Sequence, residues 1–401
     1  MPDAGAVACE VRETSRRPLI VENSRRIYVE PLAISASPEG KLLIAGRHNY
    51  LFERTASGEW NAVAQDSIFG AVLPQRGPGK SLRSPVAMRL VDGIRAVAHE
   101  NGTWAVVFAE AQTGGADQPR GRVARLWHGV VDGSGWRSLE PLPLPRAAVL
   151  EMSGASSLRR TGDTLTWALP IETPGAMPGV IVYERKGGQW YFEVVPTGYA
   201  QVDVAYSNRL GLLLAVRQAD LEQQRDANSL FLWTRDPSWR VLRRVVPGTT
   251  EHVHKPSLGF GRADGVLSWE AEVRAPEGLL RREIHAMVGD IQRRNTTVAT
   301  IDSSVVPMHP FYVLEASRGY RFWISDHIRT SSQQREIRVV QKLGDSIAVL
   351  SQFRNPFLGT FGATVTDRDD VLVAGGVRDD EREIITSLLI RFRVRCHAAA
   401  T

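Results

Sequence analysis

The sequence predicts an all-β fold, a seven-bladed β-propeller in which four-stranded sheets are arranged around a ring. The first observation is a turn residue followed by a short apolar strand that ends near a charged residue, which recurs seven times. The second is a hairpin with a polar or glycine turn, which recurs between those copies. Four short strands in each repeat of about 50 residues are typical of a propeller. The seven copies begin at Gly40, Gly102, Gly162, Asn208, Gly265, Gly319 and Asp370.

The strands themselves are read from runs of Val, Ile, Leu, Phe and Trp that are punctuated by Gly, Asp, Asn and Pro. Clear examples are "GTWAVVFAE" (102–110) and the hairpin "VIVYERKGGQWYFEVV" (180–195). Long amphipathic helical patterns are nearly absent, which supports the all-β class. Six blades remain an alternative, in which one weak repeat is an insertion.

The two ends of the chain are expected to share the last blade. Few residues follow "SLLIRFRVRC" (387–396), so the seventh repeat lacks its outermost strand. An unassigned strand, "RPLIVENSRRIYVEP" (17–31), stands at the other end of the chain. We expect this strand to complete the last blade and close the ring. Residues 1–401 then form one domain, with 1–16 as a flexible or peripheral segment.

The composition narrows the class of partner. The chain has 49 Lys and Arg against 44 Asp and Glu, a net charge of +5, without a basic stripe. A nucleic-acid partner is therefore not expected, whereas a modest positive field suits a polar or anionic small molecule. No apolar run is long enough to enter a membrane. Cys9 and Cys396 lie near opposite ends of the chain and are expected to be free, inert thiols, which predicts a cytoplasmic location.

Two segments carry a family resemblance. The hairpin "DGSGW" (132–136) and the strand pair "PLAISASPEGKLLIAGR" (31–47) resemble the blades of sialidase-type propellers, which carry Asp-box repeats. The family's box reads Ser-x-Asp-x-Gly-x-Thr-Trp, and every copy here is degenerate. The family's carboxylate-binding Arg stands ten residues before the first-blade Gly, a position held here by Glu30. Because a carboxylate repels a carboxylate, the resemblance implies the architecture and not sialidase activity.

The repeat predicts which side chains meet. In a propeller, the loops between blades and the loops joining second to third strands lie on one face, the usual ligand site. His252 and His254 precede the first strand of the fifth blade and share a face if the chain is extended there. Asp326 and His327 end the second strand of the next blade. The predicted catalytic residues are His252, His254, His309, Asp326 and His327.

Further polar residues at the same ends of the repeats are expected to bind substrate. These are His48, Glu110, Glu172, Tyr199, Arg217, Lys255 and Arg378. No organic cofactor is expected. A divalent metal is an alternative, and its ligands would be His252, His254 and His309. Metal-free acid/base chemistry and a purely structural or binding role are the other two interpretations, whereas His128 and His285 are expected to be structural.

The leading functional hypothesis is an enzyme of lyase, hydrolase or cyclase type. It would perform acid/base chemistry on a polar or anionic small molecule or sugar at the central face, with Arg217 and Arg378 orienting an acidic group. In a glycosidase version, Glu110, Glu172 and Asp326 would supply the paired carboxylates. The alternative is a non-catalytic propeller that binds a protein or glycan. The sequence predicts neither the substrate nor the oligomeric state.

Overall fold

The computed structural model describes most of the chain. The described residues are 8–19, 31–37, 41–46, 51–54, 60–62, 95–98, 102–111, 123–132, 135–145, 149–150, 156–172, 178–198, 200–207, 209–218, 229–245, 251–260, 265–274, 278, 280–289, 291, 298–304, 311–315, 321–328, 334–343, 346–358, 361–366, 368, 370–379 and 384–397. Nearly all of them lie in β-strands, and none belongs to a helix that is long and apolar enough to cross a membrane.

These residues form seven antiparallel sheets, numbered here in chain order. The first contains β2 (Pro31–Ala36), β3 (Leu42–Gly46), β4 (Leu51–Arg54) and β5 (Trp60–Ala62), and the second β6 (Arg95–Ala98), β7 (Trp104–Ala111), β8 (Val123–Asp132) and β9 (Gly135–Leu142). The third contains β10 (Val149–Leu150), β11 (Arg159–Thr161), β12 (Thr164–Glu172), β13 (Gly179–Lys186) and β14 (Gln189–Val195). The fourth contains β15 (Ala200–Ser207), β16 (Gly211–Gln218), β17 (Ser229–Arg235) and β18 (Trp239–Val245).

The remaining three sheets continue the pattern. The fifth contains β19 (Glu251–Phe260), β20 (Gly265–Arg274), β21 (Leu280–Gly289) and β22 (Val298–Ser304). The sixth contains β23 (Phe311–Glu315), β24 (Arg321–Ile328), β25 (Arg335–Leu343) and β26 (Ser346–Arg354). The seventh contains β27 (Phe361–Val365), β28 (Asp370–Asp379), β29 (Ile384–His397) and β1 (Ala8–Leu19).

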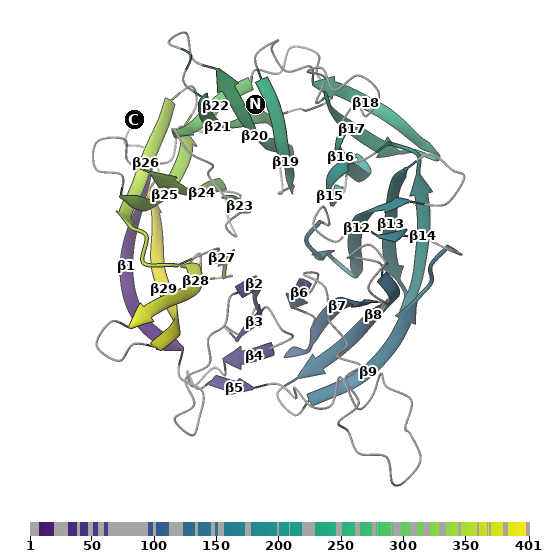
Figure 1. Cartoon of the computed structure of the whole chain (residues 1–401), viewed down its shortest axis with the longest axis horizontal. Helices are drawn as coiled ribbons and strands as arrows, with labels where there is room; N and C mark the ends of the chain where they lie inside the picture. Colours follow the sequence, from purple (N-terminus) through teal and green to yellow (C-terminus); the bar gives the residue numbers. More distant parts are fainter. Residues whose placement is uncertain are drawn as a thin grey trace, which may run out of the picture.

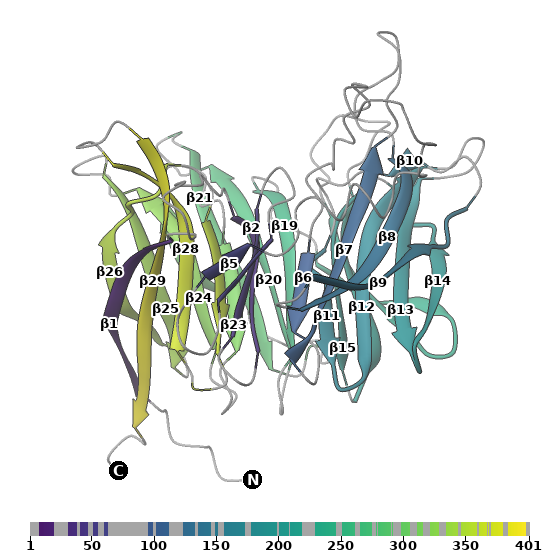
Figure 2. The ribbon, with the colours of Figure 1, turned by 90° about the horizontal axis from the view of Figure 1, so that it is seen from below.

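The sheets stand around a common axis, as Figure 1 shows. The innermost strands contact one another in order: β2, β6, β11, β15, β19, β23 and β27, and β27 returns to β2. Seen from the side, the sheets stand next to one another with their strands running between the two faces of the ring (Figure 2). The all-β propeller predicted from the sequence is the observed fold.

The seven sequence repeats correspond to the second strand of each sheet. These strands are apolar on both faces because each sheet is packed between two others. Trp104, Trp167, Trp269 and Trp323 occupy equivalent second strands and are at most 2% exposed. The Trp residues of this series therefore form the core between sheets, as expected. The third-strand positions expected for His128 and His285 are also observed, in β8 and β21.

The last sheet contains both ends of the described chain. β1 pairs antiparallel with β29, from Ala8 opposite His397 to Leu19 opposite Ser387. The closing strand is thus Ala8–Leu19, and its predicted place at 17–31 is wrong except for the last three residues of β1. The hydrophobic pattern did not locate this strand, because β1 is an outer strand rich in charged residues and contains no apolar run.

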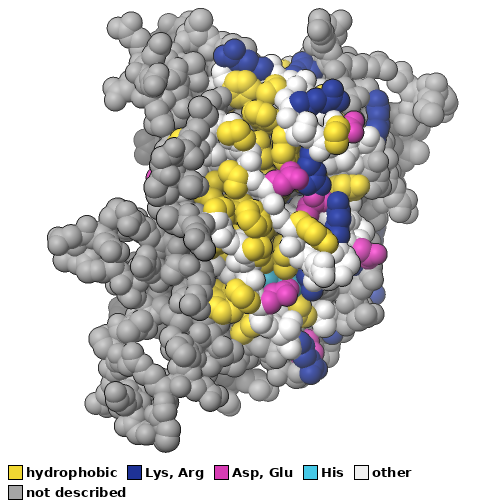
Figure 3. Space-filling model, turned by 90° about the vertical axis from the view of Figure 1, so that its right-hand side faces the viewer, with side chains coloured by type: hydrophobic (Ala, Val, Ile, Leu, Met, Phe, Trp, Pro, Cys, Tyr) yellow, Lys and Arg dark blue, Asp and Glu magenta, His cyan; other side chains and the backbone are white. Residues whose placement is uncertain are grey.

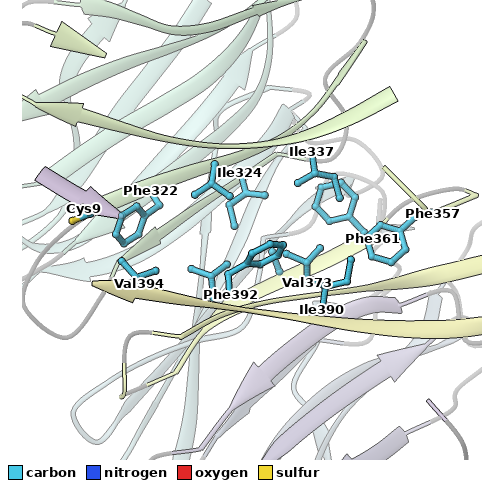
Figure 4. Close-up of a cluster of buried hydrophobic side chains, with 13 residues drawn as sticks. Cys9, Phe322, Ile324, Ile337, Phe357, Phe361, Val373, Ile390, Phe392 and Val394 are labelled. Atoms are coloured by element: carbon cyan, nitrogen blue, oxygen red, sulfur yellow. The ribbon is translucent and has the colours of Figure 1, made fainter. Parts of the chain in front are cut away.

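Cys9 and Cys396 face each other in this strand pair and form a disulfide. The prediction of two free thiols is therefore wrong, because residues 387 apart in sequence become neighbours when the ring closes. Cys9 also belongs to the apolar core between the sixth and seventh sheets, beside Phe322 and Val394 (Figure 4). The expectation of free thiols therefore no longer supports a cytoplasmic location, which stays a prediction.

Candidate functional site

The segment around the two predicted histidines is the first strand of the fifth sheet. β19 contains a bulge between His254 and Ser257, within which Lys255 has a φ of 40°. A non-glycine residue with positive φ is uncommon and is held in place by its surroundings. Here the backbone N–H of Lys255 donates to Oε1 of Gln201, on β15 of the neighbouring sheet, at 2.6 Å. The bulge is thus fixed from across the sheet boundary.

A buried carboxylate lies beside this bulge. Glu270 of β20 is directly opposite His254 in the strand pair, and its side chain is 0% exposed. Residues opposite each other in an antiparallel pair project to the same face, so His254 and Glu270 share the face toward the sixth sheet. The guanidinium of Arg282, on β21, lies 3.9 Å from the Glu270 carboxylate. A carboxylate in this setting depends on nearby positive charge.

Lys255 contributes one such charge. Loss of water around its ammonium group lowers the pKa of Lys255, and the negative charge of Glu270 opposes that shift. The residue as a whole is nonetheless exposed at the surface. Loss of water therefore favours the neutral amine, whereas Glu270 favours the ammonium form.

A second positive group comes from the fourth sheet. Arg217 is the penultimate residue of the second strand there and lies opposite Gln201, the residue that holds the bulge. Burial lowers the pKa of the Arg217 guanidinium, which remains a cation at neutral pH. We name the five residues His254, Lys255, Glu270, Gln201 and Arg217 the β19 rim. It contains an imidazole, a carboxylate and two cationic side chains from two adjacent sheets.

A separate polar cluster lies further out, between the fifth and sixth sheets. Asp302 of β22 accepts hydrogen bonds from Ser325 Oγ at 2.8 Å and from Arg338 Nη1 at 3.0 Å. His327 is 5% exposed, and its Nδ1 lies 3.9 Å from Asp302. Burial lowers the pKa of His327, and Asp302 acts in the opposite direction. This imidazole is consequently neutral at pH 7.

Asp326 belongs to a different surface, although it precedes His327 in the chain. Its carboxylate is bonded by Arg335 and accepts a hydrogen bond from Asn355 Nδ2 at 2.9 Å. Asn355 in turn accepts from the backbone N–H of Phe357 at 2.8 Å. These contacts tie the segment between the sixth and seventh sheets to β24. Neighbouring residues in a strand point to opposite faces, so Asp326 and His327 do not share one site.

The other predicted residues are distributed as follows. His48, Tyr199 and His309 lie outside the described residues. The backbone of His252 lies in β19 opposite Glu272, and the backbones of Glu110 and Arg378 are one residue from the ends of β7 and β28. Glu172 is half-buried at the end of β12, in the third sheet. From the predicted set, the described structure links Lys255 to the Gln201–Arg217 pair of the fourth sheet, places His254 opposite Glu270 on the face of the fifth sheet toward the sixth, and leaves Glu172 in the third sheet.

Sequence reasoning missed the two polar groups on which the β19 rim depends, Glu270 and Gln201. Glu270 had a readable signal, since it is a charged residue inside the apolar second strand "GVLSWEAEVR". A charge in such a strand must be paired or functional. Gln201 had none, because its role comes from a contact between residues 54 apart.

The described side chains do not form the alternative metal site. Among them, no three His, Cys, Asp or Glu side chains gather in a way that could hold a metal ion. The side chains of His252 and His309 lie outside that set, so this ligand group stays a prediction.

Comparison with known proteins identifies the architecture. No protein-family model matches the chain, and no curated protein matches it in sequence. Solved structures do match. The polysaccharide lyase Uly1 aligns with a TM-score of 0.53 at 10% identity, covering 96% of this chain and 99% of the other. A puromycin hydrolase mutant aligns with a TM-score of 0.51 at 12% identity, covering 96% of this chain and 57% of the other.

The NanB sialidase from Streptococcus pneumoniae also matches, with a TM-score of 0.47 at 10% identity over 91% of this chain and 85% of the other. At these identities the likeness shows a β-propeller fold and assigns no activity.

Proposed function

We propose that this protein is an enzyme that performs acid/base chemistry on a polar or anionic small molecule or sugar at the β19 rim. The observation that carries the proposal is Glu270, a carboxylate fully withdrawn from water, placed directly opposite His254. An imidazole paired with a buried carboxylate is a common arrangement for moving a proton at neutral pH. Lyase, hydrolase and cyclase reactions all use such a step.

The roles follow from the chemistry of each group. His254 would take or give the proton, and Glu270 would hold the imidazole and balance its charge when it is protonated. Arg217 and Lys255 would bind an acidic group of the substrate, since both are cationic and Gln201 connects them, opposite Arg217 in its strand pair and bonded to the backbone N–H of Lys255. The small excess of positive charge on the chain is consistent with an anionic substrate.

The proposal is tested by turnover on a defined panel. Uronic-acid polysaccharides report lyase activity through the ultraviolet absorbance of unsaturated products, and 4-nitrophenyl glycosides and esters report hydrolysis. On any substrate that is turned over, His254→Ala and Glu270→Gln are each expected to lower kcat/KM by about 10²–10⁴-fold.

The matched control is His285→Ala. His285 also pairs with a carboxylate, with its Nε2 2.8 Å from Glu283, but it lies in the third strand β21 and packs against Trp269. This variant should keep its activity. Unchanged kcat/KM in both His254→Ala and Glu270→Gln, with circular dichroism like that of the wild type, would rule out the β19 rim as the catalytic site.

A second candidate function, non-catalytic binding of a glycan or protein, is favoured by one surface. Apolar side chains gather on the outer edges of the third and fourth sheets (Figure 3). Tyr191 and Val194 of β14 are 54% and 43% exposed, and Val241 of β18 is 45% exposed. A half-open cavity of about 450 Å³ adjoins β14, and its lining includes Trp190, Tyr191, Phe192 and Glu193. Aromatic faces with a few polar groups are typical of binding sites.

This candidate is tested on a glycan array with Tyr191→Ser. If the edge binds glycans, the substitution removes most of the signal, whereas Val298→Ser on β22, a comparably exposed apolar position, leaves it intact. Equal signals for the two variants would contradict a binding role for β14.

A further inference from the structure

The strand pair that closes the ring carries a row of arginines. β1 and β29 lie side by side at the outer edge of the seventh sheet (Figure 1, Figure 2). In β29, Leu389 packs toward the first sheet, whereas Ile390 and Phe392 pack toward the sixth. Alternate residues of a strand share a face, and so do residues directly opposite each other in a strand pair. The face toward the first sheet therefore has five arginines, which we name the arginine strip: Arg12, Arg17, Arg391, Arg393 and Arg395.

A buried carboxylate orients two arginines of the strip. Asp370 of β28 lies opposite Arg393, and its side chain is 1% exposed. It accepts hydrogen bonds from Nε of Arg391 at 2.8 Å and from Nη2 of the same guanidinium, and a longer one from Nε of Arg393 at 3.4 Å. The two arginines remain 32% and 49% exposed, so their other N–H groups can reach a ligand. One carboxylate thus positions two cations and can neutralise only one of them.

The rest of the strip is positive charge without a partner in the described structure. Arg12, Arg17 and Arg395 are exposed and form no ion pair with any residue that the structure describes. Arg12 lies directly opposite another arginine of the strip, and like charges in that position destabilise a strand pair. The described side chains on this face include two carboxylates, Glu10 and Asp370, against five guanidiniums. An arrangement that costs stability and leaves excess charge exposed suits an anionic partner.

We propose that the arginine strip binds an acidic polysaccharide through the carboxylates of its uronic acid residues. The arginines of β29 are two residues apart, a spacing of about 7 Å, and the strip is roughly 20 Å long. Successive acidic groups of a linear polymer can therefore pair with several guanidiniums at once. A guanidinium presents a planar fork of N–H donors that matches a carboxylate. The strip already makes this type of contact internally, between Arg391 and Asp370.

The surface around the arginines favours a polysaccharide over other polyanions. Among the described residues of β1 and β29, no large hydrophobic side chain is exposed. Single-stranded nucleic acids bind by stacking their bases on aromatic side chains, and peripheral helices bind membranes by inserting apolar ones. The strip offers neither contact, so it fits a hydrophilic polymer. The inference goes beyond the proposed function, because the strip belongs to the seventh sheet and the β19 rim to the fourth and fifth.

The experiment is affinity electrophoresis of the full chain through gels that contain polygalacturonate. The Kd is expected to rise about 5–30-fold in Arg12→Ser/Arg395→Ser, which removes two exposed pairing groups. The matched control is Arg16→Ser/Arg354→Ser, which removes the same charge elsewhere. Arg16 lies on the other face of β1, in an ion pair with Glu13 at 3.0 Å, and Arg354 ends β26. The control should stay within about twofold of the wild type, because distant exposed charges are screened by salt.

The ligand has a matched control as well. Methyl-esterified polygalacturonate has the same sugar backbone without the charge, and it should not retard the protein. Oligothymidine with the same number of charges should bind more weakly than polygalacturonate, since the strip has no aromatic surface for its bases. The Tm of each variant is measured in parallel. Arg12→Ser is not expected to lower it, because the substitution removes a repulsion between opposite arginines.

Three results would overturn the proposal: no retardation of the wild type by polygalacturonate, equal losses of affinity in the two double variants, or equal retardation by the esterified polymer. Tighter binding of oligothymidine would also overturn it and would assign the strip to nucleic acid. The readout does not depend on turnover. Binding by a protein that is inactive on the substrate panel leaves the strip standing, and activity without this binding leaves the acid/base proposal standing.

Discussion

At the scale of single residues, the side to which a strand residue points decides what it can do. Asp326 and His327 are adjacent in the chain, yet the first faces the seventh sheet through Asn355 and the second faces the fifth through Asp302. The sequence shows that both residues lie near the end of a strand, so it predicts both at the same rim of the propeller. It does not show which face of the sheet each side chain points to, because the register follows only from strand pairing.

His327 carries a pH prediction. Burial lowers its pKa, so the folded protein binds this proton less readily than the unfolded chain, whose histidine titrates near its ordinary value of about 6.5. Between the lowered pKa and that value the unfolded state holds more protons, and stability falls as the pH falls. Asp302, Glu336 and Asp326 oppose the shift, and Arg338 adds to it.

The wild-type Tm should therefore drop between pH 7 and pH 5, and His327→Gln should drop less. Differential scanning fluorimetry across that range measures both slopes. Parallel slopes for the two proteins would show that His327 does not titrate in this way.

At the scale of elements, one inner-strand carboxylate joins three sheets. Asp203 of β15 accepts hydrogen bonds from Arg159 Nη2 on β11 at 2.5 Å and from the backbone N–H of Leu258 on β19 at 2.7 Å. It is 4% exposed. Because its two acceptor contacts reach both neighbouring sheets, this carboxylate helps to align the third, fourth and fifth sheets around the axis.

Asp203→Ala should lower the free energy of unfolding by about 3–5 kcal/mol, because it leaves a partly buried guanidinium and a buried N–H without their acceptor. Urea unfolding measures the change. Asp163→Ala is the control, since that side chain is 90% exposed and its ion pair with Arg160 is 3.6 Å long. Its effect should be within about 0.5 kcal/mol of zero. Similar losses in the two variants would mean that the three-sheet contact adds nothing.

Elements with a strong repeat were predictable, and those without one were not. The sequence located all seven second strands. A strand that is buried on both faces is a continuous apolar run, and this pattern remains readable when individual residues differ between repeats. The rim was predicted only in part. His254, Lys255 and Arg217 follow from the ends of strands, whereas Glu270 and Gln201 act through pairing and a contact across sheets. Those contacts depend on side-chain geometry that strand patterns do not encode.

At the scale of the whole molecule, the ring is closed by its two ends. Charged β1 gives little apolar signal, so neither its bounds nor the Cys9–Cys396 disulfide could be read from periodicity. Closure makes the last sheet depend on a strand from the start of the chain. That dependence also explains why the core of Phe322, Phe392 and Val394 includes a cysteine side chain from β1.

The disulfide should stabilise the closed ring mainly by restricting the unfolded chain, since its ends are 387 residues apart in sequence. Replacing both cysteines by serine is expected to lower the free energy of unfolding by about 2–5 kcal/mol. Hydrogen exchange should quicken in β1 and β29 before it does in β16, because β1 pairs with β29 alone and becomes the strand most easily released. A reducing agent should reproduce both effects in the wild type and change nothing in the double variant. If hydrogen exchange quickens equally in all sheets, the ring opens as one cooperative unit, and the β1–β29 strand pair is not its least stable part.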